Sequence, residues 1–189
     1  MITGPVTGII LAGGESKRMG SHKALAIWRG RRLIEWVYDA LKPLCTEILI
    51  VVNEGDFSFL DARVITDNFH DVGPAAGIES GLKASKTGTS LIVSCDTPVL
   101  STDFFRYLLD NHGNAEISLS EHDGINEPLI GVYDRNVQVV FEKALQEGRV
   151  KPPEIIRTCR WQEIRIKPGL DFYREDLFLN LNTPGDLSN

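Results

Sequence analysis

The chain has 189 residues, of which 42% are hydrophobic, and this length and composition suit a single domain with one well-filled core. Its formal net charge of −6 argues against a nucleic-acid-binding protein, because binding a duplex needs a broad field of positive charge. No stretch reaches the roughly 18 to 20 apolar residues that span a bilayer, and the first residues lack the pattern of an export signal, so we expect a cytoplasmic protein without membrane contact.

The first part of the chain alternates between short apolar runs and longer segments whose apolar residues have helical spacing. We predict strands at 6–11, 47–52, 63–66 and 90–94, and helices at 32–44, 74–85 and 102–111, the last capped by Ser101. The runs at 47–52 and 90–94 are almost entirely aliphatic, which is typical of parallel strands covered on both faces. This order predicts a three-layer α/β fold with a mostly parallel sheet, and such folds bind ligands beyond the carboxyl ends of their strands.

The second part of the chain is less regular. Strands are predicted at 115–120 and 128–133 on either side of a polar loop at 121–127, followed by a helix at 137–147 that Gly148 closes. Arg149 and Lys151 come after this helix, where they would either complement its dipole or meet a substrate phosphate.

The tail has two features of interest. Asn180 and Asn182 alternate along a predicted strand, so both side chains would face the same side of it. Thr183, Pro184 and Asp186 then have the pattern of a helix start, with a cap, a first-turn proline and an acid.

The cysteines and histidines do not follow a metal-binding pattern. Neither Cys-x-x-Cys nor His-x-x-x-His occurs among Cys45, Cys95, Cys159, His22, His70, His112 and His122. We therefore expect buried free thiols and take a surface position as the default for each histidine.

A glycine-rich basic loop directly follows the first strand. It reads Leu-Ala-Gly-Gly-Glu-Ser-Lys-Arg-Met-Gly-Ser-His-Lys over residues 11–23. Gly13, Gly14 and Gly20 allow sharp turns and close approach to a ligand, so that backbone N–H groups can point at anionic oxygens. Arg18 and Lys23 add positive charge. The loop therefore predicts binding of a triphosphate.

Polar residues also follow three other predicted strands. Asn53, Asp67 and Asp96 each come at a strand exit, so their side chains would converge at the carboxyl edge of the sheet. Asp96 emerges from a buried strand, where an unpaired carboxylate is costly unless a cation or hydrogen bonds compensate it. Mg²⁺ prefers such hard oxygen ligands, together with substrate phosphates and water. The alternative for each of these residues is a turn or cap, which Asn and Asp commonly make.

These motifs resemble those of the molybdenum cofactor guanylyltransferases, a family of nucleotidyltransferases. The loop at 11–23 is similar to the family's Leu-Ala-Gly-Gly-x-Ser-x-Arg-Met-Gly-x-x-Lys signature, and the strings Cys-Asp-x-Pro at 95–98 and Asn-x-Asn-Thr-Pro at 180–184 also match. In the Glu-Pro segment at 127–128 the family often has Gln, so this chain departs from the pattern at Glu127. The resemblance implies a Rossmann-like fold of the nucleotide-diphospho-sugar transferase type, with a nucleotide-binding half at 1–100 and an acceptor-binding half at 101–189 of one domain.

The resemblance also implies an activity: transfer of GMP from GTP to the terminal phosphate of molybdopterin, with release of pyrophosphate. Arg18, Lys23 and Asp96 would be catalytic, and Asp96 would hold Mg²⁺ as the metal ligand. GTP would be bound by Leu11, Ala12, Gly13, Gly14, Lys23, Asn53, Asp67 and Asp96. Asn180 and Asn182 would lie near the acceptor, and proteins that deliver or accept the cofactor would be transient partners.

Two alternatives remain open at this stage. Within the class, the nucleotide could be CTP or the acceptor a sugar phosphate or another cofactor, although Gly13–Gly14 stands where related cytidylyltransferases tend to have Ala-Gly and so favours GTP. Outside the class, the chain could be a nucleotide-binding regulator without turnover. The presence of Arg18, Lys23 and Asp96 argues against a regulator.

Overall fold

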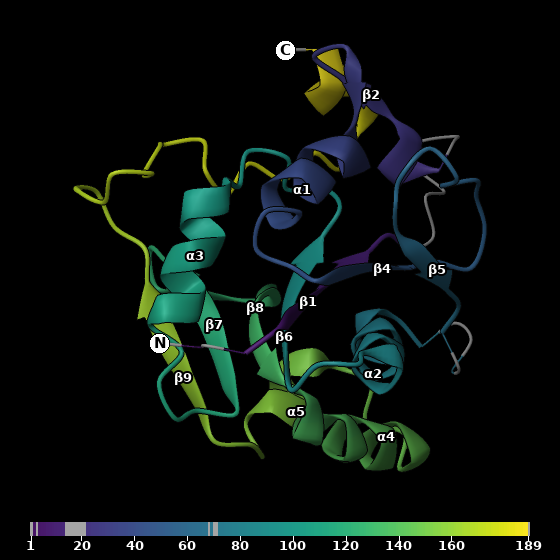
Figure 1. Ribbon diagram of the computed structural model, residues 1–189, viewed down its shortest axis with the longest axis vertical. Coiled ribbons are helices and arrows are strands. Elements are labelled where there is room, and N and C mark those ends of the chain that lie inside the picture. The colour runs from purple at the N-terminus through teal and green to yellow at the C-terminus, as the bar shows by residue number, and fades with distance from the viewer. Residues whose placement is uncertain (1, 3, 14–21, 68, 70–71, 189) are drawn as a thin grey trace.

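The computed structural model describes residues 2, 4–13, 22–67, 69 and 72–188 (Figure 1). Its main sheet has seven strands in the order β5-β4-β1-β6-β8-β7-β9, of which only β8 runs antiparallel to its neighbours. The strand bounds are β1 Val6–Leu11, β4 Glu47–Val51, β5 Arg63–Ile65, β6 Thr89–Ser94, β7 Ile117–His122, β8 Ile125–Asp134 and β9 Trp161–Arg165. The predicted mostly parallel sheet is confirmed.

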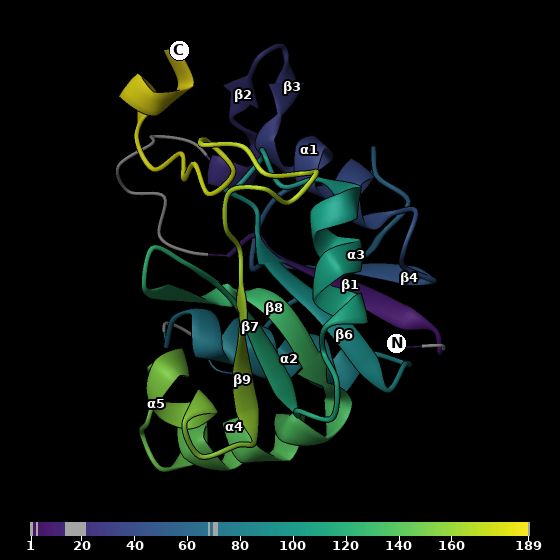
Figure 2. The ribbon, with the colours of Figure 1, turned by 90° about the vertical axis from the view of Figure 1, so that its left-hand side faces the viewer.

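Helices cover both faces of this sheet and make the predicted three layers. Figures 1 and 2 show α1 and α3 on one face and α2 and α4 on the other, with α5 beside α4. The helix bounds are α1 Leu33–Leu41, α2 Pro74–Ala84, α3 Thr102–Asp110, α4 Gln138–Gln146 and α5 Pro152–Ile156. Successive strand residues enter opposite layers: Ile10 joins the buried cluster that contains Phe104 of α3, whereas Ile9 joins the cluster that contains Ile78 of α2.

Helix α2 lies unusually close to β1 because two glycines face the strand. A Cβ on Gly77 would come within 3.1 Å of Leu11 Cδ2, and one on Gly81 within 2.6 Å of Ile9 Cγ2. The second distance is shorter than real Cβ contacts, so only glycine permits this packing. The close approach brings the amino end of α2 beside the carboxyl end of β1.

The described elements agree with the predicted ones to within a few residues over most of the chain. Ser101 caps α3 as expected, accepting a hydrogen bond from Phe104 N at 3.2 Å, and Gly148 follows α4 with φ of +79°. The predicted loop at 121–127 is wrong, because β7 extends to His122 and β8 begins at Ile125. Asp123 and Gly124 both have positive φ, which is the backbone of a two-residue hairpin turn and lets the ladder continue to the tip.

Three of the described strands and one described α-helix were not predicted. A small second sheet pairs β2 (Ile27–Trp28) with β3 (Arg31–Arg32), and the chain also contains α5 and the edge strand β9. These elements are two to five residues long, too short for a periodic pattern to stand out. The predicted strand through Asn180 and Asn182 is wrong, since this tail segment has no regular structure before the 3₁₀ turn η3 at Pro184–Ser188. Asp186 nevertheless accepts hydrogen bonds from the N–H groups of Asn182 and Thr183.

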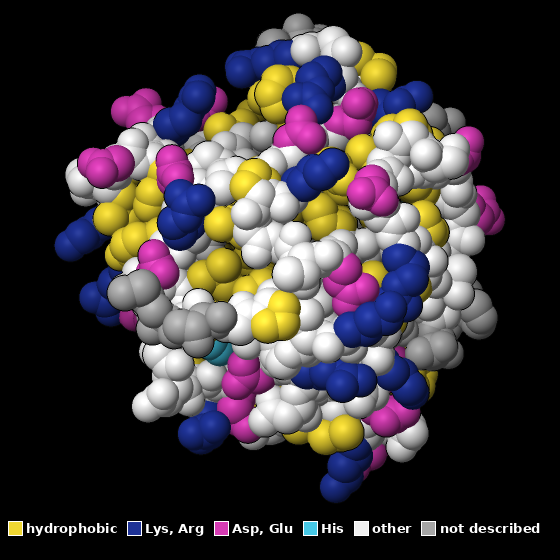
Figure 3. All heavy atoms as spheres, in the orientation of Figure 1, with side chains coloured by type: hydrophobic (Ala, Val, Ile, Leu, Met, Phe, Trp, Pro, Cys, Tyr) yellow, Lys and Arg dark blue, Asp and Glu magenta, His cyan; other side chains and the backbone are white. Residues whose placement is uncertain are grey.

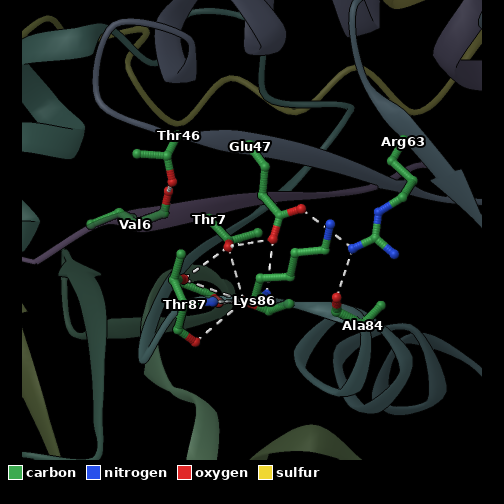
Figure 4. A network of polar contacts seen from close by, with 10 residues as sticks. Val6, Thr7, Thr46, Glu47, Arg63, Ala84, Lys86 and Thr87 are labelled. Carbon is green, nitrogen blue, oxygen red and sulfur yellow. Dashed lines mark hydrogen bonds and ion pairs between the residues drawn. The ribbon is translucent and has the colours of Figure 1, made fainter.

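A polar network joins the strands at the amino edge of the sheet (Figure 4). Thr7 bonds to Glu47 Oε1 at 3.2 Å and to Thr87 Oγ1 at 2.8 Å, and Lys86 N donates to Glu47 Oε1 at 2.9 Å. Partial burial would raise the pKa of Glu47, but the hydrogen bonds from Lys86 N–H, Thr7 and Arg63 outweigh it and lower the pKa. The hydroxyls and the carboxylate at this edge therefore have partners within the fold.

The described cysteines are free, as predicted, but only Cys95 is fully buried, whereas Cys45 and Cys159 are partly exposed. Burial raises the pKa of Cys95 to about 12, so this thiol stays protonated at neutral pH. On the face shown in Figure 3, acidic and basic side chains lie close to one another, in keeping with ion pairs such as Lys83–Glu142 and Arg106–Asp103.

Candidate functional site

Three distant segments meet at the carboxyl edge of the sheet. Lys23 Nζ donates to Asp96 Oδ2 at 2.6 Å and to Asn182 Oδ1 at 2.5 Å. The lysine follows the glycine-rich loop, the aspartate follows β6, and the asparagine belongs to the tail, 159 residues from Lys23. The side chains of Lys23 and Asp96 are only 18% and 13% exposed, so the pair is largely shielded from water.

The strand order places these groups together. β1 and β6 are parallel neighbours with Leu11 opposite Ser94, so the glycine-rich loop and Asp96 leave the sheet side by side. Cys95 N continues the ladder with a hydrogen bond to Leu11 O at 3.1 Å. The tail attaches at the same point, because Leu181 N donates to Asp96 O at 3.0 Å.

Asp96 is partly paired, and the cation that compensates it in the structure is Lys23. Its Oδ2 accepts from Lys23, whereas its Oδ1 is buried and accepts no hydrogen bond from the residues that the structure describes. A buried carboxylate oxygen without a partner is costly, and a cation would satisfy it. Together with the amide oxygen of Asn182, this oxygen fits the preference of Mg²⁺ for hard oxygen ligands. Over the described ranges no cluster of three or more His, Cys, Asp or Glu side chains could hold a metal, so substrate phosphates and water would have to complete the coordination.

The other residues implicated by sequence lie along the same edge, but the structure does not bring all of them to the lysine. Leu11 and Ala12 are buried at the end of β1, and Gly13 is exposed beyond it. Asn53 follows β4 and Asp67 follows β5, the strands on the far side of β1 from β6. The strand exits lie at one edge of the sheet, as predicted, whereas the convergence of the three side chains stays a prediction. Gly14 and Arg18 lie outside the described residues.

The two tail asparagines have different surroundings. Asn182 contacts Lys23, and its N–H donates to Asp186 Oδ2 at 2.9 Å. Asn180 is exposed, and within the described ranges its side chain takes part in no hydrogen bond. Of the two asparagines, only Asn182 thus joins the site, and Leu181 between them is buried, at 1% exposed.

His22 adds a contact that sequence analysis missed. Its ring packs edge-on against Phe57, with centroids 5.6 Å apart, so the end of the glycine-rich loop lies against the segment after β4. Burial lowers the pKa of His22, while the nearby charge of Glu54 opposes the shift. His22 is half-buried, so the surface position expected for this histidine is confirmed only in part. Its place directly before Lys23 was the signal available in the sequence.

The β7–β8 hairpin contacts the tail beyond the same edge. The ring of His122 stacks on Phe178 with centroids 3.9 Å apart and an interplanar angle of 10°. Its Nε2 lies 2.9 Å from Glu127 Oε1, so the acid that replaces the family's usual glutamine has a partner within the hairpin. Arg149 pairs with Glu147 at 2.7 Å and Lys151 with Glu154 at 3.5 Å, which favours the local, structural interpretation of both basic residues.

Comparison with known proteins identifies the family and the fold. Residues 8–162 match the family model described as the MobA-like NTP transferase domain. A probable molybdenum cofactor guanylyltransferase from Carboxydothermus hydrogenoformans is 34% identical over 182 residues, covering 96% of this chain and 92% of that protein. None of the helices described here is long and apolar enough to cross a membrane.

Two solved structures are similar over nearly the whole chain. The molybdopterin-guanine dinucleotide biosynthesis protein A from Archaeoglobus fulgidus superposes with a TM-score of 0.81 at 25% identity, covering 96% of this chain and 94% of that one. The 2-C-methyl-D-erythritol 4-phosphate cytidylyltransferase from Thermus thermophilus superposes with a TM-score of 0.71 at 14% identity, covering 97% and 95%. The second likeness shows a shared fold alone.

Proposed function

The chain belongs to the MobA-like NTP transferase family, and we propose that this nucleotidyltransferase transfers GMP from GTP to the terminal phosphate of molybdopterin, releasing pyrophosphate. The observation that carries the proposal is the contact of Lys23 with both Asp96 and Asn182 beside the glycine-rich loop. This contact places a cation, which can bind phosphate oxygens, beside two hard oxygen atoms that suit a metal ion. It lies at the edge of the sheet where folds of this class bind their substrates.

Each residue has a distinct part in the proposed reaction. The backbone of Leu11, Ala12 and Gly13, with Asn53 and Asp67, would hold the guanosine portion of GTP. Arg18 and Lys23 would neutralise the triphosphate. Asp96 and Asn182 would hold Mg²⁺, which when bound offsets the negative charge of the phosphates.

The chemistry needs no covalent intermediate on the protein. An oxygen of the acceptor phosphate attacks the α-phosphorus of GTP, a new P–O bond forms, and the bond to the β-phosphate oxygen breaks on the opposite side. Pyrophosphate leaves with the electron pair of that bond. Holding the two substrates in line and compensating their charge supplies most of the reduction in barrier.

A pyrophosphate-release assay with molybdopterin and each of the four nucleoside triphosphates tests this proposal. We expect Mg²⁺-dependent release with GTP in the presence of the acceptor and at least tenfold less with CTP, ATP or UTP. Preference for CTP would replace the guanylyl assignment by a cytidylyl one. Binding of GTP without release, with the acceptor present, would instead favour a regulator. Lys143→Met, which removes an exposed charge on α4, serves as the control for loss of one lysine.

A further inference from the structure

Lys23 Nζ contacts an oxygen of each of the two residues, Asp96 and Asn182, that would bind a divalent cation. The ammonium lies 2.6 Å from Asp96 Oδ2 and 2.5 Å from Asn182 Oδ1. We propose that Lys23 is an internal cation that excludes free divalent metal from Asp96, so that the metal enters the site only together with the nucleotide phosphates. This inference rests on the proposed function for the identity of the incoming ligand, but its central claim concerns the protein alone.

The contact distances make the two cations mutually exclusive. Mg²⁺ binds oxygen at about 2.0–2.1 Å, so an ion on Asp96 Oδ2 and Asn182 Oδ1 would overlap the position of the ammonium. Two cations so close also repel each other strongly, because the surroundings of the pair are shielded from water. Lys23 must therefore leave these oxygens before a metal can use them.

The Lys23–Asp96 ion pair is stable enough to keep a free metal ion out of the site, yet the lysine side chain can still move away from Asp96. With side chains only 18% and 13% exposed, loss of either partner would leave the other charge poorly solvated. The lysine ammonium nonetheless stands on a flexible four-carbon stem and makes rotatable point-charge contacts rather than a rigid fork. Movement to another anion nearby therefore needs no change in the backbone.

A triphosphate is the anion that can draw Lys23 away. It offers several charged oxygens, whereas Asp96 and Asn182 offer one carboxylate and one neutral amide. When Lys23 moves to the phosphates, Asp96 and Asn182 are released together, and the buried Asp96 Oδ1 becomes part of a complete oxygen ligand set with the phosphates. Nucleotide and metal would then bind to the site together.

Binding of Mn²⁺ to the full chain without nucleotide tests the inference, measured by the loss of the free-ion electron paramagnetic resonance signal. We expect weak binding by the wild type and at least tenfold tighter binding by Lys23→Met, equivalent to about 1.4 kcal/mol. Lys23→Arg, which retains the cation, and Lys143→Met, which removes an exposed charge on α4, should bind Mn²⁺ like the wild type. Adding Asp96→Asn to Lys23→Met should abolish the gain.

Equal Mn²⁺ affinity of the wild type and Lys23→Met would overturn the inference and leave Lys23–Asp96 as a structural ion pair. A gain of the same size in Lys143→Met would overturn it as well, because it would reflect net charge rather than the site. Should Lys23→Met fail to fold, judged by circular dichroism, Lys23→Gln keeps a polar side chain and replaces it. Since no nucleotide or turnover enters the measurement, its result is separable from that of the pyrophosphate-release assay.

Discussion

The N–H of Leu181 donates to the carbonyl oxygen of Asp96 at 3.0 Å, and this backbone contact attaches the tail to the exit of β6. The Leu181 side chain lies in a small buried cluster with Trp28 and Leu33. Both the backbone and the side chain of Leu181 therefore hold the tail in place. Asn182, the next residue, is thereby placed beside Lys23. The site is thus assembled from segments near both ends of the chain.

Asp96→Asn should reduce guanylyl transfer by roughly two orders of magnitude, equivalent to about 3 kcal/mol of barrier, because the amide lacks the charge that holds Mg²⁺. The melting temperature should change little, since the amide oxygen can still accept from Lys23. Steady-state kinetics at saturating Mg²⁺ and a thermal melt provide the two readouts. Asp103→Asn, at a 71% exposed position, is the control. Full activity with a lowered melting temperature would make Asp96 a structural residue only.

Asn182→Ala should lower turnover by roughly tenfold to a hundredfold, equivalent to about 1.4–2.7 kcal/mol of barrier, because the variant loses the amide oxygen proposed to hold Mg²⁺ beside Asp96. Asn180→Ala, two positions away and exposed, should retain activity within about twofold. Comparing kcat/KM of the two variants under one set of conditions shows whether Asn182, and not Asn180, contributes to turnover. Equal losses would mean that both asparagines reach the substrates.

His112→Ala should destabilise the fold by about 2–4 kcal/mol in urea unfolding, because it leaves a cavity in place of a buried ring and removes the ring's contacts with Ser118 and Asp134. The imidazole lies 2.7 Å from Ser118 Oγ and 3.3 Å from Asp134 Oδ1 and is 3% exposed, so the expected surface position is wrong. Although Ser, His and Asp occur together here, Ser118 is fully buried and no substrate can reach its hydroxyl. Asn114→Ala, at an exposed position, should leave stability unchanged. A stable His112→Ala variant would contradict the role of this network.

His22 should make the fold less stable as the pH falls below about 6.5. Burial lowers the pKa of His22 from 6.5, so as the pH falls the unfolded chain binds a proton before the folded chain does. The free energy of unfolding therefore decreases until the pH drops below the pKa of His22 in the folded state. His22→Phe keeps a ring against Phe57 and removes this contribution. Urea unfolding at pH 7.5, 6.5 and 5.5 should therefore show a smaller loss of stability in the variant than in the wild type. Parallel pH profiles would show that His22 does not contribute.

Much of the fold could be predicted from the sequence because its signals are local. Aliphatic runs such as Glu47–Val51 and helical spacing such as Leu33–Leu41 determine their elements through nearby residues, and Ser101 and Gly148 mark helix ends through their own hydrogen-bonding or backbone chemistry. The short elements β2, β3, β9 and α5 could not be predicted, since each depends on packing against segments elsewhere in the chain.

For the site, the sequence by itself determined which residue types are available: the glycine-rich loop with Lys23 after β1, Asp96 after β6, and the asparagines of the tail. Only the tertiary structure decided that Lys23 pairs with Asp96 and with Asn182 but not with Asn180. The reason is physical. A motif specifies backbone freedom and chemical groups within a few residues, whereas the pairing of groups 73 and 159 residues apart depends on strand order and on the Leu181–Asp96 backbone contact, which exist only once the sheet and the tail have packed.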